Sequence, residues 1–282
     1  MARTDTLGNF LTDVAEAIRT KEGTTETIPA SEFDTRIANL SGGGSTGGDT
    51  SNALYKPRFI SFCDYRGSEL DAELASLDTS ELTRTNGMFK SCIGLKTIDL
   101  SNHNLSSVTS MNEFCKSCTK LKKINLPKLY KVSTFYEAFC YCNGLTSIDL
   151  SDAGRDTVIT NIDSMFRDCN YLTSVNMDNF NASGVTQPTT LFYGCYTLTS
   201  LDLSTMKLGT ITSINTMFYN CRALKHLDIR NFDFTSVTNT NNAFYNVPTD
   251  CEIIVADDTQ KQWFATKFST LTNVKTVAEY EA

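Results

Sequence analysis

The sequence predicts an α/β repeat fold, a solenoid of about seven coils that follows a small N-terminal helical module. One phrase recurs seven times between residues 82 and 255 of the 282-residue chain, and six copies carry a cysteine at the same place. The anchors are Cys92, Cys118, Cys142, Cys169, Cys195, Cys221 and Val247, at spacings of 26, 24, 27, 26, 26 and 26 residues. A fixed period of this length is typical of solenoids. Solenoids usually offer a binding surface rather than a catalytic pocket.

Each of the six cysteine anchors is followed by three apolar positions, three, six and eight residues later. The first set is Leu95, Leu121, Leu145, Leu172, Leu198 and Leu224; the second is Ile98, Ile124, Ile148, Val175, Leu201 and Leu227; the third is Leu100, Leu126, Leu150, Met177, Leu203 and Ile229. The last two sets differ by two residues, the period that places both side chains on one face of a strand. We therefore expect one short strand per coil. Between them stand Asp99, Asn125, Asp149, Asn176, Asp202 and Asp228, which we expect to point outward.

A second apolar edge precedes each anchor. Three residues before it lie Phe89, Cys115, Phe139, Phe166, Phe192, Phe218 and Phe244, and nine or ten before it lie Leu82, Val108, Val132, Ile159, Val185, Ile211 and Val237. No single unit can bury its own apolar face, so each coil must stack on its neighbours.

The phrase running from Leu77 to Cys92, and again from Met217 to Cys221, resembles the BspA-like class of leucine-rich repeat, over roughly residues 60–255. That class is known from bacterial surface proteins and phage tail proteins. The Asn or Cys that general leucine-rich repeats place after the strand is replaced by His103, Leu129, Ala153, Phe180, Met206 and Phe232. This replacement favours the BspA-like class over the ribonuclease-inhibitor type.

Charge and composition narrow the function classes. The net charge of −7 argues against nucleic acid, for which a basic stripe is expected. No apolar run is long enough for a membrane span, so we expect no membrane insertion. The N-terminus lacks the apolar core of a secretion signal, which predicts synthesis in a host cytoplasm. Only two histidines are present, and we expect no metal site, no cofactor and no catalytic constellation.

The ten cysteines invite a disulfide interpretation, which their placement disfavours. One cysteine per coil is better explained as a small buried hydrophobe, and Val247 replaces it in the last copy. The close pairs Cys115/Cys118 and Cys140/Cys142 resemble metal or redox motifs, but Cys118 and Cys142 are anchors and Cys115 takes a Phe position.

The first forty residues form a different module. Residues 5–20 and 31–40 each carry a helical apolar stripe, and the segment 41–50 is Gly/Ser-rich. So short a helical module needs a partner for its apolar face, either another copy, another protein or the end of the solenoid. We predict that the docking or oligomerising residues are Leu7, Phe10, Leu11, Val14, Ile18, Phe33 and Ile37.

The string from Ala15 to Phe33 resembles a segment of tail and baseplate-associated proteins from phages of Gram-positive hosts. That resemblance implies a virion-anchoring foot, a hinge and an outward-facing arm. The domains expected are a helical module at 1–40, a linker at 41–53, a solenoid cap at 54–81, the solenoid at 82–255 and a C-terminal cap at 256–282. In the last cap we expect a strand at 251–255, a helix with Asp258 as N-cap, Trp263 in cap packing and a closing strand within 271–277.

Two columns of side chains are candidates for ligand binding. Two residues before the anchors stand Lys90, Lys116, Cys140, Arg167, Tyr193, Tyr219 and Tyr245, with Tyr196 and Tyr171 in neighbouring positions. The tyrosines Tyr193, Tyr196, Tyr219 and Tyr245 suit a protein or carbohydrate partner, or alternatively they stack on one another and shield the repeat edge. The Asp/Asn column could bind cations or sugars, but its residues more often cap turns.

The sequence thus predicts a non-enzymatic phage tail component, a tail fibre or receptor-binding protein, located in the virion. Its expected partners are other tail proteins, through the N-terminal helices, and a host surface protein or glycan. Because tail organelles are symmetric, we expect a homo-oligomer, most plausibly a trimer. The alternatives are a bacterial surface adhesin of BspA type and a tail-associated glycan depolymerase.

Overall fold

A computed structural model describes residues 62, 67 and 77–282, and these form a β-solenoid. The chain divides into two compact units, 1–57 and 58–282, and the description below concerns the second. Six complete turns separate the seven anchor positions, so the predicted solenoid and its period of about 26 residues are confirmed. The predicted residues of the N-terminal module, including its boundaries at 40 and 53, lie outside the described residues.

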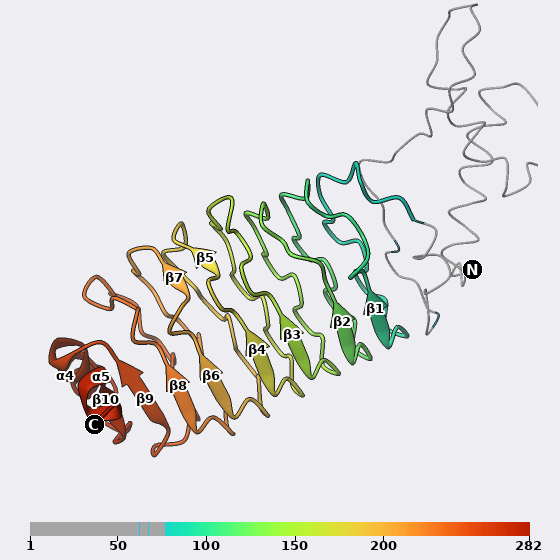
Figure 1. The fold of residues 1–282 in the computed structure, drawn as a ribbon. Coiled ribbons are helices and arrows are strands. Elements are labelled where there is room, and N and C mark those ends of the chain that lie inside the picture. Colours follow the sequence, from blue (N-terminus) through green and yellow to red (C-terminus); the bar gives the residue numbers. More distant parts are fainter. Residues whose placement is uncertain (1–61, 63–66, 68–76) are drawn as a thin grey trace, which may run out of the picture. The chain divides into compact units, whose positions relative to one another are not determined.

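One short strand per coil builds the parallel side of the solenoid, where the strands lie side by side (Figure 1). The strands are β1 (Thr97–Asp99), β2 (Lys123–Asn125), β3 (Ser147–Asp149), β4 (Ser174–Asn176), β6 (Ser200–Asp202), β8 (His226–Asp228), β9 (Glu252–Val255) and β10 (Val274–Thr276). All their pairings are parallel, in three sheets with the orders β1-β2, β3-β4 and β10-β9-β8-β6. A further pair, β5 (Asn181–Ala182) with β7 (Lys207–Leu208), joins neighbouring coils away from this side.

The register places equivalent apolar side chains on top of each other. Ile98 pairs with Ile124, Ile148 with Val175, and Leu201 with Leu227. The leucines three residues after each anchor are all fully buried, as predicted. Burying a large aliphatic side chain stabilises the fold by about 1.5–3 kcal/mol, so these columns form the core between the strands and the opposite side.

The opposite side of each coil is a column of tight turns, and this corrects the predicted α/β class. Fourteen residues with positive φ stand five and one residues before the seven anchors. They are Gly87, Glu113, Glu137, Ser164, Thr190, Thr216 and Asn242 in the first series, and Ser91, Ser117, Tyr141, Asp168, Gly194, Asn220 and Asn246 in the second. A helix cannot form through two left-handed residues four positions apart. Among the described residues, helices occur only in the C-terminal cap.

Backbone hydrogen bonds between coils hold these turns in their strained conformation. In the first described coil, the N–H groups of Gly87, Phe89 and Ser91 donate to the next coil's carbonyls, at 2.9, 2.8 and 2.7 Å. The same three bonds recur from coil to coil. A left-handed conformation costs roughly 1–2 kcal/mol at a residue other than glycine. The hydrogen bonds between coils offset this cost and keep the turns in place. The turn side is therefore a second parallel ladder.

An aromatic spine runs through the turn side. It consists of the stacked or edge-to-face rings of Phe62, Phe89, Phe114, Phe139, Phe166, Phe192, Phe218 and Phe244, with neighbouring centroids 5.2–6.3 Å apart. In the second coil the ring comes from Phe114, four residues before the anchor, and not from the predicted position of Cys115. Both side chains are fully buried, so Cys115 fills core beside the spine.

The C-terminal cap closes the spine with a helix and a strand. Helix α4 (Asp258–Lys267) brings Phe264 to 5.6 Å from Phe244. Trp263 stacks on Phe234 at 5.0 Å, which confirms its predicted packing role. The N-cap is Asp257 and not Asp258, because the Asp257 carboxylate accepts the Gln260 N–H at 3.0 Å.

The end of the chain adds the predicted closing strand. β10 pairs in parallel with β9, and a short helix, α5 (Val277–Tyr280), follows it with Thr276 and Glu279 in a capping box. None of the helices in the described part of the chain is long and apolar enough to cross a membrane.

Candidate partner-binding surface

The predicted tyrosines lie together on the turn side of coils five to seven. In coils four to seven the side chain two residues before the anchor points outward, and its neighbours at three before and at the anchor itself are buried in the core. We call the tyrosine stripe the column of Arg167, Tyr193, Tyr219 and Tyr245, together with the adjacent residues Tyr196 and Arg222.

The three column tyrosines stack face to face. The ring centroids of Tyr193 and Tyr219 are 4.7 Å apart with an interplanar angle of 3°, and those of Tyr219 and Tyr245 are 4.9 Å apart at 16°. This separation matches the spacing of neighbouring parallel strands, since each coil supplies one ring. Both interpretations of the tyrosines therefore share one geometry: the rings stack on each other, and the column still faces outward.

Exposure increases along the stripe. Tyr193 and Tyr219 are half-buried, whereas the Tyr245 side chain is 51% exposed. Tyr196 is also exposed, at 38%. Stacking already limits the rotamers of the inner rings. The tyrosine side chains therefore lose little further conformational entropy when a partner binds. The stripe is thus an ordered surface before any partner arrives.

Guanidinium groups cover two of the ring faces. The Arg167 guanidinium lies 5.2 Å from the Tyr193 ring centroid, at the N-terminal end of the stack. The Arg222 guanidinium lies 5.1 Å from the Tyr196 ring. Such cation–π contacts are worth about 0.5–1 kcal/mol at exposed sites. Arg167 also reaches Asp168 at 3.4 Å, whereas Arg222 donates to the neutral Asn220 side chain at 3.1 and 3.2 Å.

The phenol hydroxyls of the stripe are not used by the fold. Within the described residues, the hydroxyls of Tyr193, Tyr196, Tyr219 and Tyr245 have no hydrogen-bond partner. Burial, and then the neighbouring Tyr219, raise the pKa of the Tyr193 phenol above its ordinary value. The phenol therefore keeps its proton at neutral pH and remains a hydrogen-bond donor.

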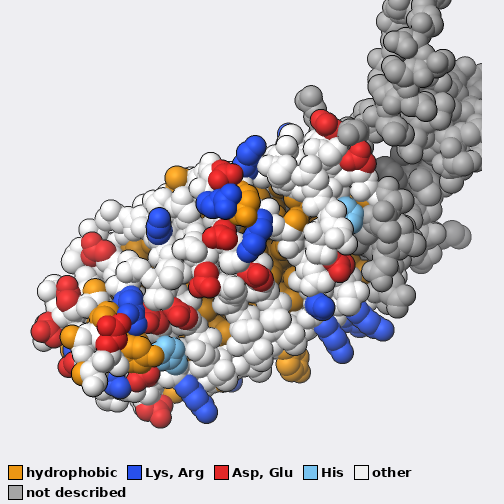
Figure 2. All heavy atoms as spheres, viewed as in Figure 1, with side chains coloured by type: hydrophobic (Ala, Val, Ile, Leu, Met, Phe, Trp, Pro, Cys, Tyr) orange, Lys and Arg blue, Asp and Glu red, His pale blue; other side chains and the backbone are white. Residues whose placement is uncertain are grey.

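The N-terminal part of the same column has a different chemistry. Lys90 and Lys116 form ion pairs with Glu113 at 2.9 Å each, and Lys116 also reaches Glu137 at 2.5 Å. These charges neutralise each other within the column. The third position of the column, Cys140, is buried. The stripe therefore begins at Arg167, and from Tyr193 onward the occupants are aromatic. On the face seen in Figure 2, acidic, basic and apolar side chains are interspersed.

The Asp/Asn column caps turns, as its alternative interpretation predicts. Asp149 and Asp202 accept the N–H of the residue two positions later, Ser151 and Ser204, at 2.9 and 2.8 Å. Asp99, Asn176 and Asp228 do the same. Asn125 is the exception, because Pro127 has no N–H to give.

Instead, the Asn125 side-chain amide donates to Asp99 in the preceding coil at 2.9 Å. Among the described residues, no group of three or more His, Cys, Asp or Glu side chains is placed to hold a metal ion.

The anchor cysteines are buried and free, and they carry an interaction that the sequence did not reveal. The nine described cysteines form no disulfide and are all buried. Each thiol of an anchor donates to the carbonyl of a residue in the preceding coil. Cys118 reaches Phe89 at 2.9 Å, and Cys169 reaches Phe139 at 3.1 Å. The anchor position therefore provides a weak hydrogen bond between coils as well as volume, and Val247 supplies only the volume.

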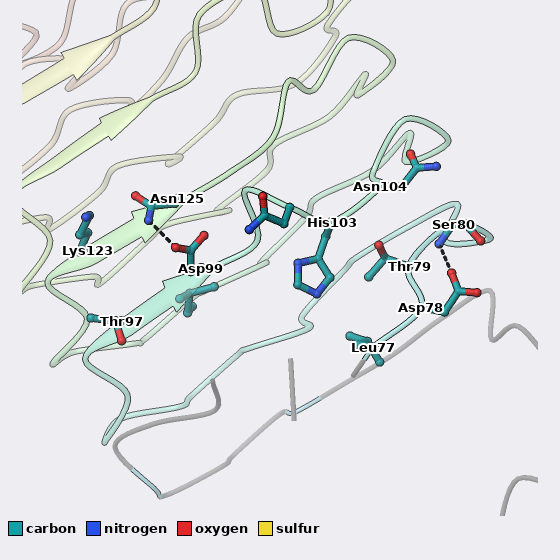
Figure 3. A pocket seen from close by; sticks show the side chains of 12 residues that line it. Leu77, Asp78, Thr79, Ser80, Thr97, Asp99, His103, Asn104, Lys123 and Asn125 are labelled. Carbon is teal, nitrogen blue, oxygen red and sulfur yellow. Dashed lines mark hydrogen bonds between the residues drawn. The ribbon is translucent and has the colours of Figure 1, made fainter. Parts of the chain in front are cut away.

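A hollow of about 750 Å³ lies at the N-terminal end of the described coils (Figure 3). Residues 77–80, 97–99 and 102–104 line it, with Lys123 and Asn125. Its internal hydrogen bonds, Ser80 N–H to Asp78 and Asn125 to Asp99, belong to turns and to the Asp/Asn column. Residues 68–76, directly before Leu77, lie outside the described part, so the hollow is the end of the described coils and we assign it no ligand.

The chain matches a known family over most of its solenoid. Residues 61–151 and residues 133–255 each match the family described as "Mycoplasma protein of unknown function, DUF285", and together they span more than half of the chain. Among solved structures, a leucine-rich repeat protein from Bacteroides ovatus ATCC 8483 is similar at 16% identity, with a TM-score of 0.30. The similarity covers 70% of this chain and 76% of that protein. No curated protein matches this chain.

Proposed function

The chain belongs to the family described as Mycoplasma protein of unknown function, DUF285, and from that premise and the geometry above we propose that it is a non-enzymatic binding protein. Its solenoid is the scaffold, and the tyrosine stripe is the surface that contacts a partner. One observation carries the proposal. Four tyrosines with unused hydroxyls and two guanidiniums gather in and beside one outward column of the solenoid.

The chemistry of the stripe suits recognition. Tyrosine offers an amphipathic ring with little conformational freedom, and Tyr and Arg are enriched among residues that dominate binding energies. The inter-coil hydrogen bonds and the aromatic spine hold the stripe rigid, which lowers the entropy cost of binding. We propose no catalytic role, and turnover in a glycan-degradation assay would contradict that part of the proposal.

The binding experiment compares variants of the full chain on cells. Labelled protein is titrated onto a panel of Gram-positive bacteria and cultured animal cells, and bound fluorescence is measured. We expect saturable binding to at least one cell type. The triple variant Tyr193→Ala/Tyr219→Ala/Tyr245→Ala should bind at least about 30-fold more weakly, because buried Tyr anchors commonly contribute 2 kcal/mol or more each.

The matched control is Tyr280→Ala. Tyr280 is 42% exposed and lies over Arg230, so it resembles the stripe tyrosines but stands in the C-terminal cap. Its binding should equal that of the unmodified chain. Equal binding by the triple variant, or no binding to any cell, would overturn the proposal.

For the place where this surface is displayed, we propose two candidates. The first is a phage tail, in which Leu7, Phe10, Leu11, Val14, Ile18, Phe33 and Ile37 dock on other tail proteins and copies of the chain form a trimer. Its support is the resemblance of residues 15–33 to tail-associated proteins. The second is a bacterial surface adhesin, which the family description favours because it names a cellular bacterium.

The two placements predict different locations for the native protein. A tail component should copurify with virions in mass spectrometry of purified particles and should be absent from the surface of uninfected cells. An adhesin should be labelled by a membrane-impermeant reagent on intact cells that release no particles. Absence from particles contradicts the tail placement, and absence from the labelled surface contradicts the adhesin placement.

A further inference from the structure

The stack determines which parts of the tyrosines a ligand can reach. Both faces of the Tyr219 ring are covered by its neighbours, and Arg167 lies over the outer face of Tyr193. A sugar ring or a base therefore cannot stack inside the column. What remains accessible is a row of ring edges and phenol hydroxyls, one per coil. Ring edges carry partial positive charge and the hydroxyls can donate, so the row favours acceptor oxygens.

The acids that contact the stripe or its neighbours belong to the fourth coil: Asp168 lies 3.4 Å from Arg167, and Asp163 accepts from the Thr190 hydroxyl at 2.9 Å. Residues 179–201, 203–227 and 234–249 include the turn sides of coils five to seven, and none of these segments contains Asp or Glu. Of the three Lys and Arg residues in these segments, Arg222 belongs to the stripe, whereas Lys207 lies in β7 and Lys225 stands directly before β8. Within the described residues, no carboxylate lies within ion-pair distance of Arg222. The chain as a whole carries −7, whereas Arg222, in the C-terminal part of the stripe, keeps a positive charge that no described carboxylate pairs with.

The side chains beside the stripe are uncharged hydrogen-bonding groups. Asn242 and Asn246 lie exposed five and one residues before the last anchor, whereas the Thr190 hydroxyl donates to Asp163 at 2.9 Å and the Thr216 hydroxyl is buried. Hydroxyl and amide groups both donate and accept, which matches the hydroxyls of a sugar. At the C-terminal end of the row, the Tyr245 ring carries no other ring or guanidinium of the described residues on its far face, so it can stack on one sugar ring.

We propose that the tyrosine stripe binds a linear anionic polysaccharide that lies along the solenoid axis. This inference rests on the proposed function and names its ligand class. The phenol hydroxyls hydrogen-bond successive sugar units, Arg222 faces a carboxylate of the polymer, and Tyr245 stacks on a ring at the end of the site. A linear polymer matches a linear row that repeats once per coil.

The same observations disfavour other polyanions. An acidic peptide would match the guanidinium but leave the phenol hydroxyls and the exposed Asn242 and Asn246 side chains with few hydroxyl partners. Single-stranded nucleic acid binds by stacking bases on open aromatic faces, and the inner faces of this column are closed. The polysaccharide uses the donors, the charge and the single open face together.

The test uses purified polymers and the full chain. Polygalacturonate, which carries one carboxylate per sugar, is the probe, with neutral dextran, poly-glutamate and single-stranded DNA as comparisons. We expect polygalacturonate to bind in a titration and to bind at least about tenfold more tightly than the other three. Binding should weaken with added salt, because exposed charges are screened.

Two conservative variants locate the contacts. The triple variant Tyr193→Phe/Tyr219→Phe/Tyr245→Phe keeps the stacked rings and removes only the hydroxyls, and we expect it to bind at least about tenfold more weakly. Arg222→Gln keeps a hydrogen-bonding side chain but removes the charge, and it should weaken polygalacturonate binding severalfold. Equal binding of dextran, poly-glutamate or DNA, or unchanged binding by the triple Phe variant, overturns the inference.

The outcomes separate this inference from the proposed function. If cell binding depends on the tyrosines in the Ala series but polygalacturonate does not bind, the ligand class is wrong and the binding surface stands. If the Ala series leaves cell binding unchanged, the proposed function itself fails.

Discussion

Replacing Phe192 with alanine should lower the free energy of unfolding by about 3–5 kcal/mol, the usual cost of removing a buried Phe side chain. The Phe192 ring is fully buried and stacks between Phe166 at 5.6 Å and Phe218 at 5.9 Å. In a solenoid each coil is held mainly by its neighbours. The loss should therefore uncouple the two halves of the spine, and it is measured by urea unfolding followed by circular dichroism.

Tyr193→Ala is the matched control, since Tyr193 is the next residue and its ring stacks in the adjacent outward column. Its substitution should cost about 1 kcal/mol, the value of an aromatic pair beyond its buried area. Equal losses for the two variants would contradict the assignment of one column to the core and the other to the surface.

The described cysteines should react with a thiol reagent at least about a thousandfold more slowly in the native chain than in urea. Access then requires local opening, and a thousandfold corresponds to about 4 kcal/mol of opening free energy. Burial raises the pKa of the Cys140 and Cys251 thiols to about 12 and holds those of Cys169 and Cys195 well above the ordinary value. At pH 8 these four thiols are thus nearly all protonated in the folded state, and the thiolate is the reactive form.

The labelling uses a Cys63→Ser variant, because Cys63 lies outside the described residues. In urea all nine remaining thiols should react, which serves as the control for free cysteines. Fast labelling of several thiols in the native variant would contradict the buried arrangement. Fewer than nine reactive thiols in urea without reductant would indicate a disulfide.

The apolar columns of the solenoid could be predicted from the sequence because they repeat. Positions such as Leu95, Ile98 and Leu100 recur with fixed spacing, and each is buried where the period places it. The same holds for the strand at 252–255 and the packing of Trp263, whose local patterns are strong.

The turn side could not be predicted in the same way. Residues as different as Glu137, Thr216 and Asn220 all adopt positive φ. In this column only Gly87 and Gly194 are glycines, the residue type that most clearly indicates such a conformation. Inter-coil hydrogen bonds impose it on the others, so the cause is tertiary and not local. The thiol hydrogen bonds and the shift of the spine to Phe114 could not be predicted from the sequence for the same reason.

For the candidate surface, the sequence identified the residues but not their arrangement. The period predicted that Tyr193, Tyr219 and Tyr245 share one column, and the structure stacks them. It did not reveal that Arg167 closes the N-terminal end of the stack or that Arg222 covers Tyr196. Those contacts depend on side-chain directions around the corner of each coil, which spacing alone does not encode.

We propose that the stripe binds a partner and does not hold the fold together. The most direct measurement is the ratio of cell-binding affinities between the unmodified chain and the Tyr193→Ala/Tyr219→Ala/Tyr245→Ala variant, taken with the unfolding free energy of each. We predict an affinity loss of at least about 30-fold in a variant that remains folded at the assay temperature. A folded variant that binds with unchanged affinity would contradict the claim.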